Sequence, residues 1–226
     1  MALPPEAAGH AAESSGLRGG SAHKAGQRRD SVVIRFAGDS GDGMQLAGMQ
    51  FTAESALAGN DIATLPDYPA EIRAPAGTIA GVSGFQVNFS SNEVFTAGDE
   101  PTVLVAMNPA ALKANLDDVP PNGVIIVDKE AFSEANVKRA GYTSNPLNDH
   151  SLDKYQVFQV DVTKLTTTAL HDTGLNNRAV FRCRNLFVLG MISWLYQRPI
   201  ESTVGLLREH ASALIPILRN HSGTPV

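Results

Sequence analysis

The sequence is short of cysteine, of basic charge and of long hydrophobic runs, and each shortage excludes a class of protein. Cys183 is the only cysteine in 226 residues, so the chain cannot form an internal disulfide or supply the four thiolates of an iron–sulfur cluster. The net charge is −5, and no cluster of lysine and arginine suggests a nucleic-acid-binding face. The longest apolar run, residues 186–196, is far shorter than the roughly 20 residues that cross a bilayer.

Several catalytic and targeting patterns are also missing. The six histidines are scattered without metal-ligand spacing, and no nucleophile has a base close to it in the sequence. No P-loop lysine follows a glycine-rich turn. Residues 1–30 lack the apolar core of a signal peptide, and their glutamates argue against a transit peptide, so we expect a cytoplasmic protein.

The composition changes abruptly near residue 30, which divides the chain. Residues 1–30 are rich in Ala, Gly and Ser and contain no Val, Ile, Phe, Tyr or Trp, so we expect a disordered N-terminal tail. Residues 31–200 are expected to form one globular domain, and residues 201–226 a C-terminal helix and tail.

Strand and helix patterns alternate through the globular part. Apolar and β-branched runs predict strands at 31–37, 62–65, 82–89, 102–107, 124–127 and 156–162. Helical patterns lie at 44–58, 110–118, 130–140, 164–171, 178–196 and 202–220. This alternation predicts an α/β, Rossmann-like three-layer domain with a mostly parallel sheet and helices on both faces. The period of two over residues 82–89 predicts that this strand is half-buried.

The strongest local pattern is a glycine-rich turn between the first strand and the first helix. It consists of Gly38, Asp39, Ser40, Gly41, Asp42 and Gly43. A helix N-terminus favours an anion, but the glycine spacing is not G-x-G-x-x-G, and two carboxylates would oppose a phosphate. Three interpretations stay open: a tight turn in which Asp42 complements the helix dipole, a backbone contact to a ligand, or a contact to another protein domain. Gly41 would be needed there if its φ is positive.

Three further polar features are candidates for binding. Arg73, in a proline-rich loop, could hold a carboxylate or phosphate with two hydrogen bonds, or could be an ordinary surface arginine. Asn108, followed by Pro109, is typical of a helix N-cap, at the end of a predicted strand where ligands often bind. Three arginines of the predicted 178–196 helix are expected on a solvated or interface face: Arg178, Arg182 and Arg184.

Several long segments of the chain, taken in sequence order, resemble one enzyme family. These segments are residues 32–45, 71–78 and 107–115, together with Arg184 and Asn185. They are similar to the gamma-type domain of 2-oxoacid:ferredoxin oxidoreductases, and most of all to the amino-terminal part of the 2-oxoglutarate:ferredoxin oxidoreductase alpha subunit. The resemblance covers residues 31–200.

The resemblance implies a reaction and a set of partners. Enzymes of this family oxidatively decarboxylate a 2-oxoacid, here 2-oxoglutarate, to an acyl-coenzyme A and pass the electrons to ferredoxin. It implies that thiamine diphosphate, Mg and an iron–sulfur cluster are held by partner domains, namely a thiamine-binding alpha-type domain and a beta subunit. It places the loops Gly38–Gly43 and Arg73–Thr78 near the coenzyme A region, and implies no catalytic residue or metal ligand in this chain. With Asn108 at the end of its predicted strand, the candidate binding residues are Gly38–Gly43, Arg73, Thr78 and Asn108.

The chain departs from the family pattern after Pro199. Family chains continue from there into a thiamine-binding half, whereas this sequence ends at Val226. We therefore expect a fragment, a truncated reading frame, or a subunit whose partner is encoded separately, and no activity from the chain alone. The alternatives are a free-standing coenzyme- or nucleotide-binding module and a fragment without function.

Overall fold

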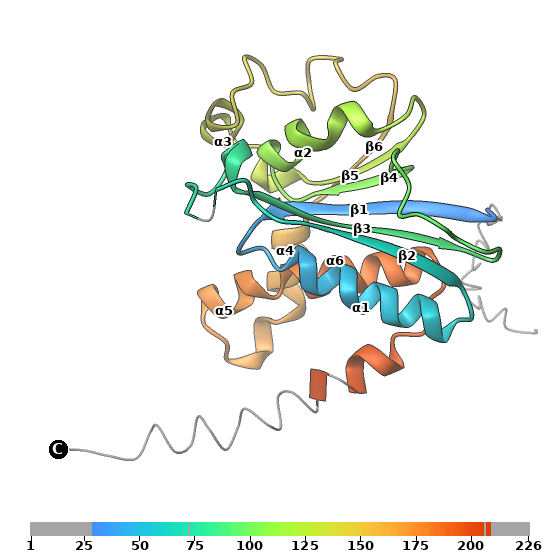
Figure 1. Cartoon of the computed structure of the whole chain (residues 1–226). Coiled ribbons are helices and arrows are strands. Elements are labelled where there is room, and N and C mark those ends of the chain that lie inside the picture. Colours follow the sequence, from blue (N-terminus) through green and yellow to red (C-terminus); the bar gives the residue numbers. More distant parts are fainter. Residues whose placement is uncertain (1–28, 72, 206, 209–226) are drawn as a thin grey trace, which may run out of the picture.

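The computed structural model describes residues 29–71, 73–205 and 207–208 of the chain. Almost all of the expected N-terminal tail, and the expected C-terminal helix and tail from residue 209 onward, lie outside these residues. The described residues form a twisted sheet with helices on both sides (Figure 1). No helix within this described part is long and apolar enough to cross a membrane.

The sheet has six strands among the described residues, in the order β2-β3-β1-β4-β5-β6. Their bounds are β1 Ser31–Asp39, β2 Asp61–Asp67, β3 Val82–Ser90, β4 Val103–Ala106, β5 Val124–Asp128 and β6 Gln156–Val160. β1, β4, β5 and β6 pair in parallel, whereas β3 is antiparallel to both β1 and β2. The prediction of a mostly parallel, Rossmann-like sheet is therefore confirmed.

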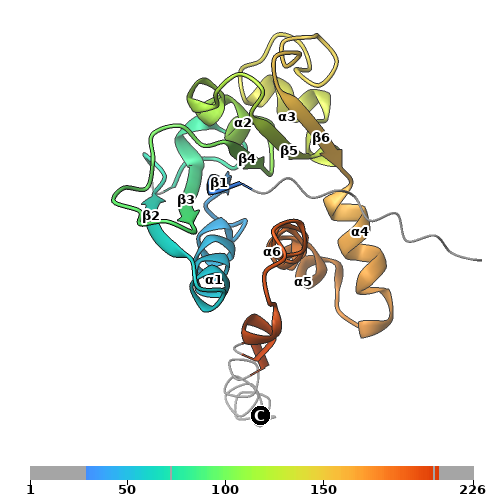
Figure 2. The ribbon, with the colours of Figure 1, turned by 90° about the vertical axis from the view of Figure 1, so that its right-hand side faces the viewer.

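Two helical layers cover the sheet, one on each face (Figure 2). The first contains α1 Met44–Leu57, α4 Val162–Ala169, α5 Asn177–Arg182 and α6 Arg184–Leu195, and the second contains α2 Pro109–Asn115 and α3 Glu134–Arg139. Short 3-10 turns lie at Ile79–Gly81, Leu116–Asp118, Lys129–Ala131 and His171–Thr173. A further helical stretch begins at residue 201. The predicted helices on both faces are thus present.

Each face of the sheet has its own apolar core, because successive strand residues point to opposite sides. In β4, Val103 and Val105 join the core under α1 and α6, whereas Leu104 and Ala106 join the core under α2 and α3. Phe51 of α1 is central to the first core, with its ring centroid 5.3 Å from that of Phe89. The continuous apolar runs predicted to be buried strands are buried on both faces for this reason.

The prediction that strand 82–89 is half-buried is wrong. Gln86, on the face away from α1, is only 2% exposed. Its Nε2 donates to the carbonyl of Ala97 at 2.8 Å, and its Oε1 accepts from Arg35 Nε at 2.7 Å. The polar positions of β3 are therefore satisfied inside the protein, so alternation of polarity does not mark a solvent-facing side here.

The prediction of one long helix over residues 178–196 is also wrong. α5 ends at Arg182 and α6 begins at Arg184, with Cys183 between them at φ −84° and ψ 0°. The apolar pattern runs through this break without interruption. The side chain of Arg184 forms ion pairs at the start of α6.

Substitution by alanine should change the stability of the protein in opposite directions at two glycines inside helices. A Cβ on Gly48 of α1 would lie 2.3 Å from the ring of Phe85, whereas a Cβ on Gly190 of α6 would meet nothing within 4 Å. We expect Gly48→Ala to lower the free energy of unfolding by about 1–3 kcal/mol through overpacking. We expect Gly190→Ala to raise it by about 0.5–1 kcal/mol through helix propensity. Urea denaturation measures both changes, and a stabilising Gly48→Ala would contradict the close packing of α1 on β3.

Candidate functional site

The carboxyl ends of β1, β4 and β5 meet at one edge of the sheet. From β1 the chain crosses to β2 on one side, and from β4 it continues to β5 on the other, so the direction of winding reverses between β1 and β4. Ligands of open α/β sheets bind in the crevice at such a reversal. The glycine-rich turn follows β1 and Asn108 follows β4, which places both at this point.

The conformation of the glycine-rich turn requires glycine at position 43, where φ is +73°. Gly43 is the N-cap of α1, and a Cβ on it would lie 2.4 Å from Nδ2 of Asn185. Gly41 has no positive φ and has open space around it. The backbone conformation at Gly41 therefore does not require glycine. The position that does require it is Gly43, two residues later.

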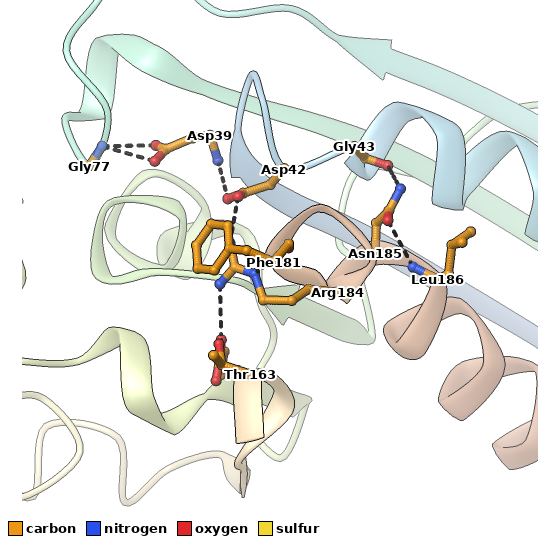
Figure 3. Close-up of polar contacts among 10 residues, drawn as sticks. Asp39, Asp42, Gly43, Gly77, Thr163, Phe181, Arg184, Asn185 and Leu186 are labelled. Carbon is orange, nitrogen blue, oxygen red and sulfur yellow. Dashed lines mark hydrogen bonds and ion pairs between the residues drawn. The ribbon is translucent and has the colours of Figure 1, made fainter. Parts of the chain in front are cut away.

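Asp39 joins the glycine-rich turn to the proline-rich loop before β3 (Figure 3). Both of its carboxylate oxygens lie 3.0 Å from the backbone nitrogen of Gly77 and accept its N–H. Close by, the backbone N–H of Ser40 donates to the carbonyl of Gly81 at 3.2 Å. The structure thus brings together two segments that the sequence marked as separate candidates.

The remaining predicted residues have different surroundings. Arg73 is exposed, and Thr78 Oγ1 donates to the carbonyl of Pro75 at 2.7 Å within its own loop. Asn108 is buried, and its Oδ1 accepts from the backbone N–H of Ala111 at 2.8 Å. Asn108 therefore caps α2, as the Asn-Pro pattern predicted, and its Oδ1 is already engaged.

Arg184 is the centre of the polar contacts at this edge. Its Nη2 lies 2.8 Å from Asp42 Oδ1, and its Nη1 lies 3.2 Å from Asp128 Oδ2. The ring of Phe181 lies over the guanidinium, with its centroid 3.5 Å from Cζ. One buried arginine therefore links the turn after β1, the last residue of β5 and the end of α5.

The expectation of a solvated or interface face is wrong for Arg184, which is buried inside the chain, whereas Arg178 and Arg182 are exposed as that expectation requires. The helix break at Cys183 separates Arg184 from the other two and lets its side chain point into the sheet edge. Sequence patterns from physical chemistry alone did not single it out. The only signal was that Arg184 and Asn185 belong to the segments that carry the family resemblance.

Asp128 was not predicted as a site residue. Its side chain is fully buried, and its Oδ2 also accepts from Thr163 Oγ1 at 3.0 Å. Its Oδ1 has no hydrogen-bond partner among the described residues. The available signal was an acidic residue directly after the apolar run 124–127, because a carboxylate at the end of a buried strand must find a partner.

The charges at this cluster do not balance. Arg184 supplies one positive charge, whereas Asp42 and Asp128 supply two negative charges in a place that water hardly reaches. Burial raises the pKa of Asp42 above its ordinary value of 3.8, and the ion pair with Arg184 opposes this shift without cancelling it. The surplus negative charge disfavours an anion directly beside Asp42.

A small cavity opens beside Arg184. Its volume is about 280 Å³, and it is lined by Thr163, Thr167, Asn177, Val180, Phe181 and Arg184. This is below the range of about 300–1,000 Å³ typical of pockets for drug-sized ligands, so it would admit only part of a large molecule. Among the described residues, no three His, Cys, Asp or Glu side chains are grouped to hold a metal ion. The edge offers anchoring groups, and the hydroxyl of Thr163, which lines the cavity, is hydrogen-bonded to Asp128.

Removing the guanidinium should destabilise the fold strongly. Arg184→Met would leave the carboxylates of Asp42 and Asp128 buried without their cation, so we expect the free energy of unfolding to fall by about 3–5 kcal/mol. The matched control is Arg182→Met, because Arg182 is exposed and only two residues away; its effect should stay within about 0.5 kcal/mol. Similar losses for the two variants in chemical denaturation would contradict the central place of Arg184.

The titration of Asp42 should show in the pH dependence of stability. Since its pKa is raised in the folded state, Asp42 contributes stability that is present below pH 3.8 and is lost as the pH rises through the raised pKa. Asp42→Asn lacks this titration. We therefore expect the unfolding free energy of the wild type, minus that of Asp42→Asn, to fall between pH 3.8 and neutral pH. Denaturant titrations across this range measure it, and a rising difference would mean that the ion pair outweighs burial.

The sequence matches a family and one of its members over most of its length. The family described as pyruvate ferredoxin/flavodoxin oxidoreductase matches residues 33–215. The 2-oxoglutarate oxidoreductase subunit KorA of Mycobacterium tuberculosis (strain ATCC 25618 / H37Rv) is 52% identical over 183 residues, which are 81% of this chain and 28% of KorA. The chain thus spans less than a third of the length of this relative.

A solved structure shares the fold at lower sequence identity. The 2-oxoglutarate:ferredoxin oxidoreductase from Magnetococcus marinus, with 2-oxoglutarate, coenzyme A and succinyl-CoA bound, is 22% identical with a TM-score of 0.54, over 74% of this chain and 24% of that chain. The gamma subunit of a keto/oxoacid ferredoxin oxidoreductase from Geobacter sulfurreducens PCA is 22% identical with a TM-score of 0.47, over 72% of this chain and 75% of that chain. By its matches to the family and to KorA, this chain belongs to the pyruvate ferredoxin/flavodoxin oxidoreductase family.

Proposed function

We propose that this chain is the gamma-type component of a 2-oxoacid:ferredoxin oxidoreductase that converts 2-oxoglutarate to an acyl-coenzyme A and passes the electrons to ferredoxin. The observation that carries the proposal is the 52% identity to KorA, a 2-oxoglutarate oxidoreductase subunit, over 81% of this chain. The same relative favours 2-oxoglutarate over other 2-oxoacids as the substrate.

The proposal assigns the redox chemistry to partners. The chain spans 28% of KorA, and its single cysteine falls short of the four thiolates that an iron–sulfur cluster needs. A thiamine-binding alpha-type domain and a beta subunit would carry thiamine diphosphate, Mg and the cluster. Thiamine diphosphate held there would supply a nucleophilic carbon and an electron sink for decarboxylation of the 2-oxoacid.

The part of this chain is to bind and orient coenzyme A at the carboxyl edge of the sheet. Arg73 is exposed and makes no hydrogen bond to another described residue, so its guanidinium is available for a phosphate. The loop that carries Arg73 is held in place by Asp39, which accepts the N–H of Gly77. A fixed loop loses little conformational entropy when a ligand binds, which favours binding through Arg73.

An assembled enzyme is needed to test this role. A full-length KorA chimera, in which this chain replaces the 183 matched residues, can be assembled with the KorA beta subunit. We expect the isolated chain to show no 2-oxoglutarate oxidation with coenzyme A and a viologen acceptor, and the chimera to show turnover.

In the chimera, Arg73→Ala should raise the KM for coenzyme A by about tenfold, equivalent to ~1.4 kcal/mol, with little change in kcat. Arg178→Ala, another exposed arginine, is the control and should leave both constants unchanged.

Each part of the proposal has its own contradicting result. Turnover by the isolated chain would overturn the need for partners. An inactive chimera beside active KorA would overturn the enzymatic role, and coenzyme A binding to the isolated chain by calorimetry would then favour a free-standing binding module. An unchanged KM for coenzyme A in Arg73→Ala would mean that Arg73 does not bind coenzyme A, and would not affect the proposed enzymatic role.

A further inference from the structure

The helix α6 is apolar on its outer side as well as its inner side. Between Asn185 and Gln197 the sequence contains no Asp, Glu, Lys or Arg. Val188 and Ile192 on the inner side are buried in the core under α1. On the outer side Trp194 is 75% exposed and Leu195 is 47% exposed. A surface helix of a globular protein normally has a polar outer side, so the composition of α6 is that of a helix covered on both sides.

The helical stretch after Pro199 extends this apolar region. Glu54 of α1 joins the two segments, because its Oε2 accepts from Ser193 Oγ and its Oε1 accepts from Thr203 Oγ1 at 2.6 Å. Ser193 of α6 and Thr203 of the later stretch are thus held by one carboxylate, so the two segments lie side by side. We define the α6 surface by the exposed side chains Trp194, Leu195, Ile200 and Val204.

Two further features of the α6 surface are typical of a protein–protein interface: a glycine inside the helix, and polar side chains around the apolar ones. Gly190 lies in the middle of α6, where glycine costs about 1 kcal/mol relative to alanine, yet nothing in the described chain lies within 4 Å of where its Cβ would be. A glycine without such a neighbour leaves room for another backbone to approach closely. Gln197 and Glu201 are exposed beside the apolar residues. An apolar centre with polar side chains around it is the usual composition of a protein–protein interface.

We propose that the α6 surface is where this domain binds the polypeptide equivalent to the part of KorA that the chain does not match; this rests on the proposed function. The matched residues are 28% of KorA, so most of that protein is available to cover such a surface. The absence of charge from the α6 surface fits a permanent interface, which is more apolar than a transient one. α6 also runs from Arg184 at the candidate site to Trp194 and Leu195 of this surface.

A cysteine on the α6 surface can report whether it is covered. In a Cys183→Ala background, Leu195→Cys places a thiol on the surface, and Gln159→Cys places a control thiol on the exposed edge strand β6. Both are labelled with a maleimide in the full chain alone and in the KorA chimera assembled with its beta subunit, and the labelled peptides are quantified by mass spectrometry. We expect labelling at position 195 to slow at least tenfold in the chimera and labelling at position 159 to keep its rate.

A second variant tests binding itself. Trp194→Glu should leave the thermal midpoint of the isolated chain within a few degrees, since the side chain is exposed, and should prevent the chimera from assembling, as judged by size-exclusion chromatography. Normal assembly of this variant would overturn the proposal.

If another segment or molecule covers the α6 surface, the labelling results will differ, and either of the following two results would overturn the proposal. Slow labelling of the isolated chain at every concentration would mean that residues 209–226 cover the surface, and protection that grows with concentration would mean a second copy. A chimera that turns over 2-oxoglutarate while position 195 stays reactive would refute the α6 surface and leave the proposed function standing. If the chimera is inactive beside active KorA, the proposed function fails, and the labelling ratio still decides whether the surface is covered.

Discussion

The salt bridges of Arg184 are the interaction on which the carboxyl edge of the sheet depends. Two carboxylates distant in sequence, Asp42 in the turn after β1 and Asp128 at the end of β5, are buried on either side of one guanidinium. The planar fork of arginine suits this place, since a lysine ammonium could not reach two carboxylates and stack on Phe181 at once. Arg184 is also the first residue of α6, so the site and this helical layer are joined at one point.

The glycine-rich turn is held from two sides. Asp42 connects it to α6, and Asp39 connects it to the proline-rich loop through Gly77. Both acidic side chains are therefore used to fix the shape of the turn within the chain. A ligand that approaches this turn would meet backbone groups and the neighbouring loop rather than free carboxylates, which fits the proposed place of Arg73 beside it.

The sequence predicted the helices and strands more accurately than it predicted the candidate site. Apolar runs such as 102–107 and 124–127 indicate buried strands because they are too short for a typical helix and have proline or glycine close by. The break at Cys183 and the burial of Gln86 did not follow, since both depend on partners distant in sequence. Likewise the spacing of three glycines indicates a turn, but which of them takes a positive φ depends on the position of Asn185. The family resemblance marked Arg184 without indicating its role.

The position of Trp194 has a practical consequence, because it is the only tryptophan in the chain. Its indole is largely in water, so the tryptophan fluorescence of the isolated chain should come from one place on α6, with the long-wavelength emission of a hydrated indole. Burial of that ring would shift the emission to shorter wavelength and reduce quenching by acrylamide. The unmodified chain therefore carries an optical probe at the outer surface of the helix that begins at Arg184.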